Sequence, residues 1–231
     1  DWVEIYNPTS EIVNLSGYGL SDDNEDFHKW IFPSININPN EFLVVFASEK
    51  NRSDVIYNWD AVIDWGDEWF YFPGNSAPTP DWQYLETDIS FWSTGNSGFG
   101  YGDNDDNTNI SQVISLYVRK DFLITNASNI AKALFHLDYD DGYVAYINGV
   151  EFSRRNLGAP GSPVNYNTTT SALHEAEIYS GGFPEQVIID LDNHPLNNGV
   201  NTLAIEVHNY SSNSSDLSCI PFLTLGYNAI V

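Results

Sequence analysis

The sequence predicts an all-β fold of the sandwich or jelly-roll type. No segment of the 231 residues keeps apolar residues at helical spacing for more than about two turns. Short apolar stretches recur instead, and clusters of Gly, Asn, Pro and Asp separate them. The strands expected from this pattern span 3–6, 41–47, 115–124, 131–138, 143–148, 186–191, 202–208 and 220–225. Many short strands joined by turns are typical of β-sandwiches and jelly rolls.

Two of these strands carry different apolar patterns. The stretch 41–48, EFLVVFAS, has a continuous apolar centre, which predicts a central strand buried on both faces. The stretch 201–210 alternates, so Leu203, Ile205 and Val207 face one way, and Ala204, Glu206 and His208 the other. We therefore expect His208 to be a half-exposed strand residue rather than a ligand.

The stretch 136–152, HLDYDDGYVAYINGVEF, reads as a strand followed by a hairpin. Asn148-Gly149 is a two-residue hairpin turn signal, and Asp141-Gly142 is a second turn signal. Asp138, Asp140 and Asp141 interrupt the alternation. Such acids could be paired catalytic carboxylates, cation ligands, or partners of Arg119, Arg154 or Arg155 in structural ion pairs. We favour structural pairing or cation binding, because nothing in the sequence places a catalytic partner nearby.

A second acidic segment resembles a calcium loop. In the stretch 98–110, GFGYGDNDDNTNI, Asp103, Asp105 and Asn107 fit the first three ligand positions of an EF-hand. Thr108 stands where that loop needs Gly and Ile114 where it needs Glu, so this is not an EF-hand. We expect a structural Ca²⁺ site of another kind, or an acidic turn held by Asx hydrogen bonds. Its candidate ligands are Asp103, Asp105, Asp106, Asn107, Asp138, Asp140 and Asp141.

Composition limits the function further. The 32 acids and 8 bases give a net charge of −24, which disfavours nucleic acid and anionic membrane surfaces as partners. The sequence contains no run of 18 apolar residues, so we expect no membrane insertion. Cys219, the single cysteine, lies in an apolar run and is expected to be a buried structural residue. We expect no catalytic residue, because no nucleophile–base motif, P-loop or zincin motif is present.

Aromatic residues are the remaining binding candidates. The 7 Trp and 14 Tyr could include a platform for sugar rings, although most such residues belong to cores. Trp82 follows the Pro-rich stretch 73–82 and is expected to be the most exposed of them. Tyr143 and Tyr146, in the predicted hairpin, are the other two candidates.

Motifs in two blocks resemble known families. The segments Asp1–Asn7, Asn14–Asp22, Lys29–Pro33 and Ile37–Val45 together resemble the lamin-tail domain family. The stretches FWSTGNSGFGYGDNDDNT, LYVRKDF, LDYDDGYVAYINGVEFSRRN and NTLAIEVHN are similar to galactose-binding-like jelly rolls. The resemblance implies a partial immunoglobulin-like lamin-tail sandwich at 1–53, a linker at 54–61, a jelly roll at 62–227, and a return to the first domain at 228–231.

The resemblance also implies a setting. These domains occur in secreted bacterial proteins that carry CotH-kinase-like domains, so we expect an extracellular or cell-surface protein. The expected function is a non-catalytic accessory module for adhesion, spacing or carbohydrate binding, with glycans or neighbouring protein domains as partners. The alternatives are a subunit of an extracellular filament or matrix, and a fragment of an enzyme whose CotH-kinase-like or hydrolase domain lies outside this chain.

Overall fold

The computed structural model describes residues 2–46, 56–102 and 106–228, and the chain divides into two units. The units are Asp1–Tyr57 and Asn58–Val231, so the division falls within the predicted 54–61 linker. The linker prediction is wrong for its last residues, because Asn58–Ile63 forms strand β7 and pairs with β18 (Leu217–Tyr227). The backbone N–H of Asn228 also bonds within the second unit, to the carbonyl of Asn129 at 2.9 Å.

The first unit consists of three antiparallel strand pairs. They are β1 (Trp2–Tyr6) with β6 (Phe42–Phe46), β2 (Val13–Asn14) with β5 (Asn36–Ile37), and β3 (Gly19–Leu20) with β4 (Trp30–Ile31). Its core is small. Leu15, Phe32 and Ile37 are buried, and Leu43 and Val45 of β6 pack against them.

The other face of β6 is uncovered, which corrects one prediction. Phe42, Val44 and Phe46 are exposed, and β6 pairs with β1 alone among the described strands. The expectation of a central strand buried on both faces is therefore wrong for the described part of this unit. An apolar run predicts burial only when a second layer is present to cover it.

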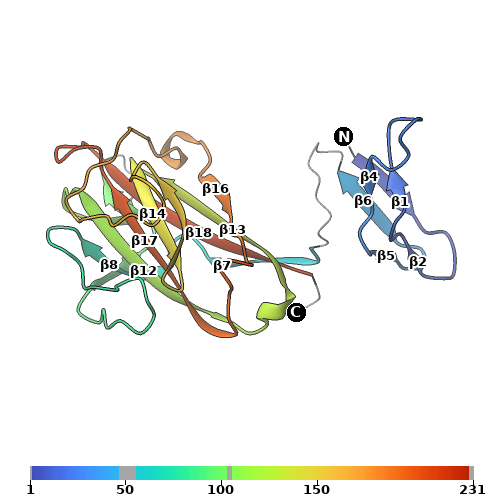
Figure 1. The fold of residues 1–231 in the computed structure, drawn as a ribbon, viewed down its shortest axis with the longest axis horizontal. Coiled ribbons are helices and arrows are strands. Elements are labelled where there is room, and N and C mark those ends of the chain that lie inside the picture. Colours follow the sequence, from blue (N-terminus) through green and yellow to red (C-terminus); the bar gives the residue numbers. More distant parts are fainter. Residues whose placement is uncertain (1, 47–55, 103–105, 229–231) are drawn as a thin grey trace. The chain divides into compact units, whose positions relative to one another are not determined.

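The second unit is a two-layer β-sandwich, and the all-β prediction is confirmed (Figure 1). One sheet has the order β11-β10-β18-β13-β16, with β7 also beside β18, and the other has the order β15-β14-β17-β12-β8-β9. The remaining strands are β8 (Glu68–Pro73), β9 (Ser93–Asn96), β10 (Phe99–Tyr101), β11 (Thr108–Asn109), β12 (Ser115–Ile124), β13 (Ile130–Tyr139), β14 (Gly142–Ile147), β15 (Val150–Arg155), β16 (Glu185–Ile188) and β17 (Gly199–His208).

All eight predicted strands are present, with ends that differ by a few residues. The helices of the described residues are two 3₁₀ turns, η1 (Ala127–Asn129) and η2 (Ile178–Ser180). Neither turn has the length or the apolar character needed to cross a membrane.

The predicted hairpin turn between β14 and β15 is also confirmed. Asn148 and Gly149 have φ angles of 49° and 82°. This left-handed pair suits the twist of a two-residue hairpin and favours Asn followed by Gly. A Cβ at Gly149 would also collide with the ring of Tyr84.

The main core lies between the two sheets. Leu203, Ile205 and Val207 of β17 point into it, as their alternation predicts, and Cys219 is fully buried there. A second, smaller apolar layer covers the outer face of the β15–β9 sheet. In it, Trp82, Ile89 and Trp92 of the loop 74–92 pack over Tyr117 and Ala204. Because this loop folds back onto the sheet, it forms one wall of the groove described next.

Candidate functional site

A groove of about 410 Å³ lies on the outer face of the β15–β9 sheet. The loop residues 78–83 and 161–164 line its sides. Tyr117 of β12, Tyr146 of β14 and Glu206 of β17 come from the sheet itself. They share this face because their neighbours in each strand alternate into the main core.

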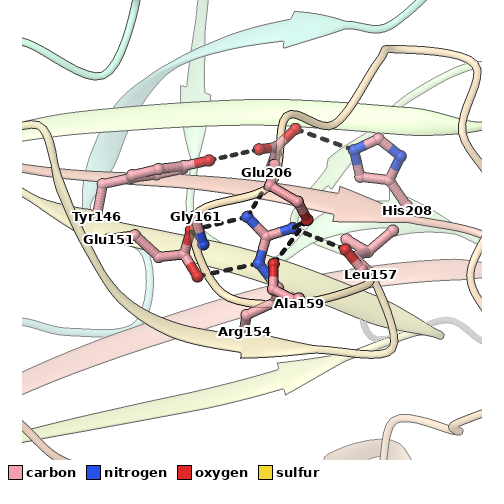
Figure 2. A network of polar contacts seen from close by, with 9 residues as sticks. Tyr146, Glu151, Arg154, Leu157, Ala159, Gly161, Glu206 and His208 are labelled. Atoms are coloured by element: carbon pink, nitrogen blue, oxygen red, sulfur yellow. Dashed lines mark hydrogen bonds and ion pairs between the residues drawn. The ribbon is translucent and has the colours of Figure 1, made fainter.

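A buried polar network runs through the groove, with Glu206 at its centre. The Tyr146 hydroxyl donates to Oε1 of Glu206 at 2.7 Å, and Nε2 of His208 lies 3.1 Å from Oε2. Figure 2 shows Glu206 between the phenol of Tyr146 and the ring of His208. Burial, and then the nearby charge of Glu206, raise the pKa of Tyr146, which keeps the hydroxyl protonated as a donor.

His208 is fully buried, so the expectation of a half-exposed residue is wrong. Its Nδ1 lies 2.8 Å from the carbonyl oxygen of Thr168, in the long loop after β15. That carbonyl can only accept, so Nδ1 carries a proton. The covering loop is the reason that the outer face of β17 is buried at this position.

Arg154 and Glu151 of β15 form a second network beside the first (Figure 2). Nε and Nη2 of Arg154 donate to the two carboxylate oxygens of Glu151 at 2.9 and 2.7 Å. Nη1 donates to the carbonyl of Leu157 at 2.7 Å, and Nη2 also donates to that of Ser162 at 2.9 Å. Burial acts to raise the pKa of Glu151, but the hydrogen bonds from Arg154 and Gly161 outweigh it and hold that pKa below its usual range. The pair ties the loop 157–162 to the strand.

Of the three predicted sugar-binding residues, two line the groove. Tyr146 is half-buried there. Trp82 also lines it but is only 7% exposed, so its predicted exposure is wrong. Its ring packs edge-on against Tyr117 at 5.1 Å and stacks on Trp92 at 5.8 Å. Tyr143 is fully buried in the main core, with its hydroxyl 2.7 Å from Ser153 Oγ, so the prediction that it binds sugar is wrong. It points to the opposite face of β14 from Tyr146.

Arg119 holds the groove wall in place, and the sequence did not indicate this role. Its guanidinium is buried beneath the loop 74–92. Nη1 lies 3.1, 2.9 and 3.0 Å from the carbonyl oxygens of Trp82, Tyr84 and Thr87, and Nη2 donates to that of Leu85 at 3.2 Å. One feature of the sequence could have indicated this role. By alternation, Arg119 lies on the same strand face as Tyr117, at a position where an apolar residue would be expected.

The three acids of the predicted hairpin accept hydrogen bonds from backbone N–H groups. Asp138 accepts the N–H groups of Glu177 and Ile178, each at 2.8 Å, one on each oxygen. Asp141 accepts those of His174 at 3.0 Å and Tyr210 at 2.6 Å. Asp140 Oδ1 accepts that of Ala176 at 2.6 Å. All three side chains are buried and support the segment 174–178 of the loop after β15.

The predicted ion pairs therefore have other partners. Arg154 pairs with Glu151 and Arg155 with Glu185. Arg119 Nε lies 3.6 Å from Asp121. Asp138 and Asp141 need no arginine, because two backbone N–H groups satisfy each of these buried carboxylates.

The calcium site stays a prediction, and two of its seven candidate ligands have other partners on both carboxylate oxygens. The described residues contain no group of three His, Cys, Asp or Glu side chains placed to hold a metal ion. Both carboxylate oxygens of Asp138 and of Asp141 accept backbone hydrogen bonds, so these two do not fit a cation site. Asp103 and Asp105 lie outside the described residues. Asn107 Nδ2 donates to the carbonyl of Ser97 at 3.3 Å.

No family model and no curated protein sequence matches this chain. Similar solved structures include three β-glucuronidases. The Bacteroides uniformis enzyme is 13% identical, with a TM-score of 0.47 over 73% of this chain and 18% of that chain. An enzyme from an uncultured Clostridium sp. is 14% identical, with a TM-score of 0.46 over 74% and 29%. The Ruminococcus gnavus enzyme, in complex with uronic isofagomine, is 11% identical, with a TM-score of 0.44 over 73% and 28%. The chain thus spans less than a third of their length, and similarity this distant carries no inference about activity.

Proposed function

We propose that this chain is a non-catalytic β-sandwich module that binds carbohydrate in the groove over Tyr146. The observation that carries the proposal is the combination of aromatic rings and hydrogen-bond acceptors in one groove on a rigid sheet. The apolar faces of sugar rings pack on aromatic side chains, and sugar hydroxyls bond to carboxylates. The volume of the groove, about 410 Å³, suits a small ligand, since such sites usually measure roughly 300–1,000 Å³.

The state of the two groove glutamates supports a non-catalytic role. Glu151 is held by both nitrogens of the Arg154 fork, and Glu206 by Tyr146 and His208. General acid–base catalysis needs a carboxyl group that exchanges a proton with the substrate, whereas these carboxylates already bind internal donors. The resemblance to lamin-tail and galactose-binding-like domains of secreted bacterial proteins supports an extracellular or cell-surface setting.

Calorimetric titration with a panel of neutral, amino and uronic oligosaccharides tests the proposal. We expect at least one member to bind, and Tyr146→Ala to weaken that binding by about tenfold, the effect of losing one stacked aromatic contact. Tyr179→Ala is the matched control, because Tyr179 is exposed on η2 and does not line the groove. Failure of the whole panel to bind, or unchanged binding by Tyr146→Ala, would contradict the proposal. Hydrolysis of a chromogenic glycoside that Glu206→Gln abolishes would favour an enzyme instead.

A second candidate function is a subunit of an extracellular filament or matrix, in which the first unit binds a second copy of the chain. The exposed face of β1 and β6 favours it, since Trp2 and Phe46 are 60% and 72% exposed and Tyr6 stacks on Phe42 at 4.4 Å. Light scattering over a range of concentrations tests this function. A strict monomer at every concentration would exclude assembly through this face.

A further inference from the structure

The groove that we propose to bind carbohydrate is acidic. Three carboxylates line it, those of Asp81, Glu151 and Glu206. Arg154 pairs with Glu151, and His208 faces Glu206, so Asp81 carries the charge that a ligand meets. The chain as a whole carries a net charge of −24, so no distant positive field offsets this local one. An anionic ligand would be repelled from the groove, and a cationic one attracted.

Arg154, the one cationic side chain among the described residues that line the groove, is not available to a ligand. Arg154 has five N–H donors, and five protein acceptors lie within hydrogen-bond distance of them. Nε and Nη2 reach Glu151, Nη1 reaches Leu157 O, and Ser162 accepts through its carbonyl from Nη2 and its hydroxyl from Nη1. The side chain is only 5% exposed. The carboxylate of a uronic acid would therefore find no free guanidinium N–H group of Arg154 to pair with.

Acceptors, in contrast, remain available at the rim. Asp81 is exposed, and its carboxylate accepts no hydrogen bond from the part of the chain that the structure describes. Its own backbone carbonyl is already fixed by Tyr84 N and Thr87 Oγ1, so the residue is held at the groove edge. A carboxylate in this position can accept from a sugar hydroxyl or pair with an ammonium group.

Building on the carbohydrate-binding function proposed above, we infer that the groove selects amino sugars with a free ammonium group and rejects uronic acids. Asp81 supplies the pairing carboxylate, and Tyr146 supplies the aromatic contact. The neutral sugar binds by the same stacking contact but lacks the charge pairing, so its affinity lies between the other two.

Three tetrasaccharides that share one β-1,4 backbone test this order, namely those of glucosamine, glucose and glucuronic acid. At about 20 mM salt, and at a pH that keeps glucosamine protonated, we expect the glucosamine tetramer to bind about fivefold more tightly than cellotetraose, and the glucuronic acid tetramer least tightly. At about 500 mM salt the difference should shrink, because the charges are screened.

Asp81→Asn isolates the proposed contact. Asn tolerates the left-handed backbone of position 81, where φ is 60°, so the loop should keep its shape. We expect about a threefold loss of affinity for the glucosamine tetramer and a smaller loss for cellotetraose, because the Asn oxygen can still accept from a hydroxyl but cannot pair with an ammonium group. The matched control is Asp60→Asn, an equal charge change on β7 of the other sheet, which should change neither affinity.

The outcomes separate this inference from the function on which it rests. Equal affinities for the glucosamine and glucose tetramers, or tightest binding of the glucuronic acid tetramer, would overturn the inference and leave carbohydrate binding intact. Tetralysine binding as tightly as the glucosamine tetramer would also overturn it, because charge alone would then explain the preference. If none of the three tetrasaccharides binds, the inference and the proposed function both fail.

Discussion

In the first unit, β1 and β6 leave Trp2, Phe42 and Phe46 exposed, whereas in the second unit β17 has buried side chains on both faces along most of its length. The difference lies in what covers each strand. The inner face of β17 packs into the main core, and loop residues such as Trp82 and Thr168 cover its outer face. No described residue of the first unit gives β6 a comparable second layer. Burial therefore depends on the layers around a strand rather than on its own composition.

The same difference decides where a binding site can form. A groove needs walls as well as a floor, and the second unit has both because its loops fold back onto the β15–β9 sheet. In the first unit, no described loop lies over the two-stranded face of β1 and β6, which suits flat association rather than the capture of a small ligand. Small units also bury a smaller share of their surface and are correspondingly less stable.

The largest expected effect comes from the same core truncation made in each unit. Phe135→Ala should cost the second unit about 3–5 kcal/mol and leave it folded. Phe32→Ala should unfold the first unit, because Phe32 is one of only three buried apolar side chains in the described part of its core. Denaturant titrations followed by the amide NMR signals of each unit measure both effects. A single shared transition, equally shifted in the two variants, would contradict the picture of two independent cores.

The next largest effect concerns Arg119, whose hydrogen bonds hold the loop 74–92 on the sheet. Arg119→Lys keeps the charge but cannot reach the four carbonyls, so we expect the free energy of unfolding to fall by about 2–4 kcal/mol. We also expect a red-shifted Trp fluorescence, because Trp82 becomes exposed. Arg155→Lys is the control, because its ion pair with Glu185 is largely solvent-exposed and should contribute less than about 1 kcal/mol. Equal melting temperatures for Arg119→Lys and the wild type would show that the loop is held by apolar packing alone.

These two regions also show how much the sequence could predict. Alternation correctly placed Leu203, Ile205 and Val207 in the core, and Asn148-Gly149 correctly marked a hairpin turn, because both features are local. The burial of His208 depends on a loop, and that of Trp82 on strands, that are distant in sequence, so no local pattern indicates either. The groove also forms between residues that are distant in sequence. Tyr146 and Glu206 lie 60 residues apart and meet only because β14 and β17 are neighbours.

A smaller effect is expected for Asp138, which holds the segment 174–178. Asp138→Asn replaces one acceptor by a donor that faces a backbone N–H, so the free energy of unfolding should fall by about 1–3 kcal/mol. Thermal melts with Ca²⁺ and with a chelator should show the same loss, since Asp138 is held by backbone donors. Asp192→Asn, an exposed control, should change little in either condition. A loss that disappears in the chelator would instead make Asp138 part of a calcium site.

The smallest effect concerns His136, a half-buried residue on the same outward side of β13 as Asp138. Burial lowers its pKa below the ordinary 6.5. The contact of 3.0 Å between its Nε2 and Nε2 of Gln186 agrees with this, because the amide can only donate there and needs an unprotonated ring nitrogen. The unfolded chain therefore binds the proton more readily. The contribution of His136 to stability is complete above pH 6.5 and is lost as the pH falls through the lowered pKa.

The loss should stay below about 1 kcal/mol, because solvent reaches part of the ring. An NMR titration of the His136 ring should show a midpoint below 6.5, and Gln186→Ala, which removes the donor, should move that midpoint upward. A midpoint at or above 6.5 would mean that burial does not set the pKa of His136, and that the covering of this side of β13 extends over Asp138 but not over His136.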